Sequence, residues 1–128
     1  MDTQATISGG RTQSAITGQC FCGHIRYRSE GPIIESNYCD CRGCQRANGT
    51  LRVPWVVVPL TSLKIVAGEP SRVRSEAYPE GTCDGYGGER AFCPTCGTQL
   101  FWYGDGRDKV DICAGTLDDT SQFQPKHG

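Results

Sequence analysis

The sequence that decides this fold is Cys20-Phe21-Cys22-Gly23 together with Cys93-Pro94-Thr95-Cys96-Gly97, two cysteine pairs far apart in the chain. Two sulfurs on one tight turn can reach the same zinc ion, at about 2.3 Å each. A structural zinc site is commonly a closed tetrahedron built from two such pairs. We therefore predict one zinc ion that joins the first part of the domain to the last, held by Cys20, Cys22, Cys93 and Cys96. Buried thiols or disulfides are the alternative.

Composition explains why a metal is needed. The chain has 128 residues, of which 37% are hydrophobic, and its mean hydropathy is −0.44. This is the size of one domain with a thin apolar core. Seventeen glycines and seven prolines favour short strands and turns over long helices. Nine cysteines are available to supplement the core with bound metal.

Cysteine number and charge limit the compartment and the partners. Nine cysteines cannot all pair internally, and residues 1–15 carry no pattern of an export signal, so we expect a cytoplasmic protein with reduced thiols. The net charge of −1 argues against a nucleic-acid partner. Apolar runs are strand-sized, so no membrane span is expected. The oligomeric state stays open.

Residues 1–14 read as a disordered lead-in, 15–120 as the zinc-binding domain and 121–128 as a tail. Arg42 to Asn48 is the best helix candidate, with Gly49 placed to end it. Pro54 suggests an edge strand or a bulge, and 79–88 should be a loop. Alternating or apolar patterns predict strands at 15–20, 24–28, 37–41, 52–58, 63–66, 71–75, 98–103 and 109–114.

A third cysteine cluster lies just before the expected helix, at Cys39, Cys41 and Cys44. Three ligands and an exchangeable position distinguish catalytic zinc sites from closed structural ones, so we predict a second, more labile zinc here. The alternative is a second closed site, completed by one of Cys83, Cys113, His24 and Asp40.

Other residues near the third cluster are harder to assign. Arg42 and Arg46, four apart on one helix face, would supply positive potential beside Cys44, or they are a solvated face. Tyr38, Trp55 and Trp102 could wall a pocket, or they belong to the core. Cys113 is expected to be a small core residue. Cys83, His24 and His127 receive no function.

The cysteine motifs resemble those of the glutathione-dependent formaldehyde-activating enzyme family, which includes centromere protein V. The resemblance covers most of the chain, in the family's motif order. The matching segments are Gly18-Gln19-Cys20-Phe21-Cys22-Gly23-His24-Ile25-Arg26-Tyr27, Cys39-Asp40-Cys41-Arg42-Gly43-Cys44-Gln45-Arg46-Ala47, Phe92-Cys93-Pro94-Thr95-Cys96-Gly97-Thr98 and Gly115-Thr116-Leu117-Asp118.

This resemblance implies a mainly β fold, a β-tent of antiparallel sheets organised around the four-cysteine zinc, with one short helix. It also implies a second zinc on Cys39, Cys41 and Cys44, and the activity of S-(hydroxymethyl)glutathione synthase, a carbon–sulfur lyase. The leading hypothesis is an enzyme that adds a small, glutathione-like thiol to a small aldehyde such as formaldehyde, or reverses the addition. The alternative is a non-catalytic, zinc-dependent carrier or sensor of such thiols.

Overall fold

The structure, a computed structural model, describes residues 15–78 and 87–126. The expected lead-in 1–14, Cys83 and His127 lie outside these residues. Within the described ranges the chain is mainly β, as predicted, with one α-helix, α1 (Arg42–Asn48). Its strands are β1 (Ile16–Gln19), β2 (Arg26–Ser29), β3 (Glu35–Cys39), β4 (Val53–Pro59), β5 (Leu63–Ala67), β6 (Ser71–Arg74), β7 (Gly88–Phe92), β8 (Gln99–Gly104) and β9 (Lys109–Cys113).

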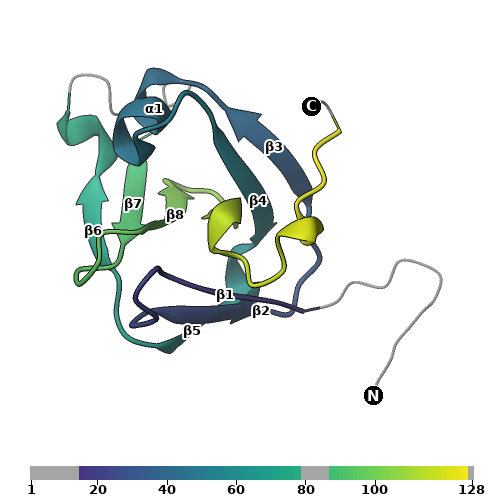
Figure 1. Cartoon of the computed structure of the whole chain (residues 1–128). Helices are drawn as coiled ribbons and strands as arrows, with labels where there is room; N and C mark the ends of the chain where they lie inside the picture. The colour runs from purple at the N-terminus through teal and green to yellow at the C-terminus, as the bar shows by residue number, and fades with distance from the viewer. Residues whose placement is uncertain (1–14, 79–86, 127–128) are drawn as a thin grey trace, which may run out of the picture.

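The strands form two antiparallel sheets. A three-stranded sheet has the order β1-β2-β5, and a six-stranded sheet has the order β3-β4-β9-β8-β7-β6. The small sheet lies at the bottom of Figure 1, and α1 lies near the top, at the opposite end of the large sheet.

The main core lies on one face of the large sheet. Side chains at cross-strand positions, such as Val56 opposite Ile112 and Phe101 opposite Ile112, share this face. They are fully buried together with Ile16, Ile25 and Tyr27 from the small sheet and its turn. The Tyr27 and Phe101 rings meet edge to face, with centroids 5.1 Å apart.

The expected helix is confirmed at its residues. Cys41 is the N-cap, and its sulfur accepts a hydrogen bond from the Cys44 amide. Gly49 ends the helix in the left-handed region, at φ 65°, where a side chain would be strained. After the last strand, Phe123 packs on the main core and its ring centroid lies 5.2 Å from that of Tyr38.

Two details differ from the sequence-based expectations. The edge placement of 52–58 is wrong, since β4 lies between β3 and β9. Pro54 is tolerated because pairing with β9 begins only at Trp55, so the missing amide proton of proline breaks no bond there. Strand β7 was not predicted, because Gly88, Glu89 and Arg90 break the apolar alternation.

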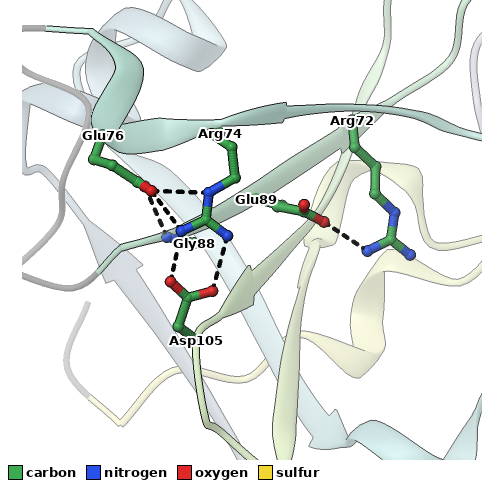
Figure 2. A network of polar contacts seen from close by, with 6 residues as sticks. All are labelled: Arg72, Arg74, Glu76, Gly88, Glu89 and Asp105. Atoms are coloured by element: carbon green, nitrogen blue, oxygen red, sulfur yellow. Dashed lines mark hydrogen bonds and ion pairs between the residues drawn. The ribbon is translucent and has the colours of Figure 1, made fainter.

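An ion-pair network joins the ends of β6, β7 and β8 (Figure 2). Arg74 donates to Glu76 and, with both terminal nitrogens, to Asp105 at 3.0 and 2.6 Å. Glu76 also accepts from the Gly88 amide at 3.3 Å. Hydrogen bonds from Arg74 lower the pKa of Glu76 and the pKa of Asp105. The network fixes the strand ends that flank residues 79–86.

This network should add a small acid-sensitive increment to stability. A depressed folded-state pKa favours folding above the unfolded pKa, and the benefit is lost as pH falls through the folded pKa. Stability should therefore fall more steeply with acidification in wild type than in Arg74→Gln. Urea unfolding at a series of pH values measures the free energy of unfolding of both proteins. If this free energy falls equally with pH in the two proteins, the prediction is contradicted. Arg28→Gln, which removes another exposed ion pair, is the control.

None of the helices in the described residues has the length and apolar character needed to cross a bilayer.

Candidate metal centres and the adjoining cavity

The first cysteine group comes from two turns that the fold brings together. Cys20 and Cys22 lie on the turn between β1 and β2, and Cys93 and Cys96 lie on the turn between β7 and β8. All four sulfurs lie within 4.8 Å of one another. The Cys20–Cys22 and Cys22–Cys93 sulfur distances are 3.7 and 3.8 Å. A tetrahedron with zinc–sulfur bonds of 2.3 Å has edges of about 3.8 Å, so the group fits zinc.

Backbone amides and a hydroxyl group donate hydrogen bonds to three of the four sulfurs, whereas burial and the neighbouring cysteines raise the pKa of the Cys22 thiol to about 11. The Ile25 amide lies 3.3 Å from the Cys20 sulfur, and the Thr95 and Cys96 amides lie 3.3 and 3.4 Å from the Cys93 sulfur. The Thr98 hydroxyl, 3.1 Å from the Cys96 sulfur, helps to lower the pKa of the Cys96 thiol to about 5. Thiolates held by such donors are ready to bind a cation.

The second group lies where β3 passes into α1. Cys39 ends β3, Cys41 caps the helix and Cys44 is buried in its first turn. Their sulfurs lie within 4.8 Å of one another, so this group could also hold a metal ion. Cys39 and Cys41 are only partly buried, so this group is less enclosed than a core site.

The candidates for a fourth ligand do not join this group. Cys113, His24 and Asp40 are absent from the set of donor atoms within 4.8 Å, and Cys83 lies outside the described residues. Cys113 is buried against Trp55 and Trp102, and burial raises the pKa of its thiol to about 12. It is therefore a neutral thiol that accepts a hydrogen bond from Asn48, at 3.3 Å.

The large sheet presents a second face beneath α1, which we call the α1-side face. Directly opposed residues on antiparallel strands share a face. Across the sheet, Arg90 pairs with Trp102, and Trp102 pairs with Asp111. Asp111 in turn pairs with Val57, which pairs with Glu35. Side chains from five strands therefore form one row on this face, and all of them except Val57 are polar or aromatic.

Arg90 is the cation that sequence reasoning missed. Its residue exposure is only 5%, and its Nη2 lies 3.7 Å from the Cys44 sulfur. A buried guanidinium needs a compensating negative charge. The contact therefore favours a thiolate at Cys44. No local motif marks Arg90, because it reaches Cys44 only through the strand order.

The two predicted arginines occupy the outer side of the helix. Arg42 and Arg46 are both exposed, and Arg42 donates a hydrogen bond to Gln45 at 2.6 Å. Their contribution to the site stays a prediction. Because water screens exposed charges, Arg90 is the stronger source of positive potential.

A cavity of about 580 Å³ adjoins the second cysteine group. Two residues of the cysteine group, Cys39 and Cys44, line this cavity. Three aromatic residues also line it, namely Tyr38, Trp55 and Trp102. Charged residues line the cavity as well, namely Arg107, Asp108, Lys109 and Asp111. A small polar molecule in this cavity would meet both the cysteine group and these charged side chains.

Comparisons with known proteins agree with this architecture. The family model described as glutathione-dependent formaldehyde-activating enzyme matches residues 15–128. A crystal structure of a Rhodobacter sphaeroides protein, a structural genomics target, is similar with a TM-score of 0.61. The two sequences are 20% identical, and the similarity covers 80% of this chain and 87% of that one, which shows a shared fold. No curated protein matches.

Proposed function

This chain belongs to the glutathione-dependent formaldehyde-activating enzyme family, and on that premise we propose that it adds a small, glutathione-like thiol to a small aldehyde such as formaldehyde, or reverses the addition. The product would be an S-hydroxymethyl thiol, and the reaction class is that of a carbon–sulfur lyase. A cytoplasmic location is part of the proposal, because cysteine ligands must stay reduced.

One observation supports this function above the others. The cavity opens onto the three-cysteine group, whereas the four-cysteine group is completed by its own sulfurs. Zinc held by Cys39, Cys41 and Cys44 would supply a position for a thiol and favour its deprotonation. The four-cysteine group would hold a structural zinc.

Residues around the cavity have separate tasks in this proposal. Trp55 and Trp102 provide apolar walls that limit access of water. Arg90 compensates the negative charge that accumulates when another thiolate joins three cysteine thiolates. The charged residues that line the cavity would bind the polar part of the thiol compound.

Cobalt substitution tests the proposal. Addition of millimolar glutathione should change the cobalt–thiolate absorption of the wild-type protein, and NMR exchange between formaldehyde and its glutathione adduct should exceed the uncatalysed rate. A spectral change without faster exchange would favour the carrier or sensor hypothesis. Cobalt spectra indifferent to thiol would contradict both. Elemental analysis of protein purified without chelator should give between one and two zinc ions per chain.

Replacing Arg90 is expected to weaken thiol binding more than replacing the two helix arginines. Arg90→Met removes a buried cation next to Cys44, and a hydrogen bond to a charged group contributes about 1.5–3 kcal/mol. We expect a loss of affinity of tenfold or more. Thiol titration monitored by cobalt absorption measures it, with the double variant Arg42→Gln, Arg46→Gln as the control. If the double variant loses more thiol affinity than Arg90→Met, then the two helix arginines, and not Arg90, supply the positive potential.

A further inference from the structure

Asp111 is an acidic residue that lines the cavity. It lies on β9, directly opposite Trp102 on β8 and Val57 on β4. Its side chain is 18% exposed, which is low for a carboxylate. The cavity that it lines also exposes Cys39 and Cys44. The β-sheet thus places a carboxyl group and the cysteine group along the same cavity.

The charges that face Asp111 come from several elements. Arg107 Nη2 lies 2.9 Å from Asp111 Oδ1. Burial raises the pKa of the Asp111 carboxyl and Arg107 opposes this, whereas Glu35 on β3 and Cys44 on α1 raise it further. Asp108 and Lys109 line the same cavity, and Arg90 lies beyond Trp102 in the row. A negative charge on Asp111 is therefore less favourable than on an exposed aspartate.

Trp102 lies beside Asp111 in the same cavity wall. The residue is 6% exposed, and its buried Nε1 has no hydrogen-bond partner among the described residues. Arg107 packs over its ring, with Cζ 5.4 Å from the centroid. Trp102 and Arg107 thus limit the contact of Asp111 with water.

The proposed reaction needs a proton carrier, because the thiol loses a proton and the aldehyde oxygen gains one. We propose that Asp111 carries this proton. This inference rests on the proposed function. It assigns a role to a residue outside the cysteine motifs.

In the forward direction the proton of the S–H bond moves to a carboxylate oxygen of Asp111. The sulfur electron pair then forms the C–S bond to the carbonyl carbon, and the π pair of the C=O bond moves to oxygen. Asp111 returns its proton to that oxygen, which gives the hydroxymethyl group. Atoms and charge balance without a further reactant, and the reverse reaction follows the same path.

Isothermal titration calorimetry of the zinc-loaded protein with glutathione, without aldehyde, tests the first half of this path. Heats at pH 7 in buffers of different ionisation enthalpy give the number of protons released on binding. Wild type should release close to none, because Asp111 takes the proton, and Asp111→Asn should release about one. Glu69→Gln, which removes an exposed carboxylate that does not line the cavity, should release the same number of protons as wild type.

The same experiment separates the two hypotheses. If glutathione binds and wild type and Asp111→Asn release equal numbers of protons, Asp111 is not the carrier, although the proposed function stands. If glutathione does not bind wild type, the proposed function and this inference fall together. A second measurement uses only the wild-type protein, and it tests the inference even if Asp111→Asn folds poorly. The carboxyl carbon NMR signal of Asp111 in wild type should move toward the protonated position on glutathione addition, and an unchanged signal would overturn the inference.

Discussion

Cys93→Ser is expected to leave no cooperatively folded protein. Cys93 is fully buried, and its sulfur lies 3.8 Å from that of Cys22. This sulfur also accepts hydrogen bonds from two backbone amides. Zinc bound by four such sulfurs contributes about 10 kcal/mol in small zinc domains. That is comparable to the whole stability of a domain of this size. Circular dichroism and urea unfolding of the purified variant measure the loss.

The control for this variant is Thr95→Ser, a change at an exposed residue of the same turn. It should bind metal and unfold as wild type does. A Cys93→Ser protein that unfolds cooperatively and within about 2 kcal/mol of wild type would mean that the four-cysteine group does not hold a structural metal.

Cys41→Ser should have the opposite outcome, a folded protein without thiol binding. Serine is a favourable N-cap residue, so its hydroxyl can replace the sulfur that accepts the Cys44 amide. The third thiolate of the second group is nevertheless lost, and that group would no longer hold its metal. We expect metal content to fall by about one ion where both sites are filled. Elemental analysis measures the metal content, urea unfolding measures the stability, and the cobalt titration measures thiol binding.

Asp40→Asn is the matched control, because Asp40 is exposed between Cys39 and Cys41 and is not part of the sulfur group. It should retain metal and thiol binding. If Cys41→Ser unfolds as completely as Cys93→Ser, both groups are structural and the proposed function fails.

Local sequence was sufficient to predict the short elements and the cysteine groups. The helix at Arg42–Asn48 follows from its capping residues, and the turn at Cys22-Gly23 from the two alternating segments beside it. The sulfurs of each pair are close because the spacing within a turn fixes them. The pairing of Cys20 and Cys22 with Cys93 and Cys96 was predictable, since a closed tetrahedron needs two pairs.

The cavity wall was not predictable in the same way. Arg90 lies on a strand with no apolar alternation, and Asp111 lies between apolar neighbours in a strand that predicts only core packing. Neither residue belongs to a motif. Their relation to Cys44 depends on strand order and register, which pair residues separated by long stretches of chain.

The sequence by itself thus determined the donor atoms, their grouping into four and three, and the mainly β class, because ligand spacing and turn chemistry act over a few residues. Only the tertiary structure decided which charges surround the open group. Sheet register places Arg90 against Cys44 and Asp111 in the adjoining cavity. The physical reason is that the free energy of a buried charge depends on its neighbours in space. In a β-sheet these neighbours come from distant parts of the chain.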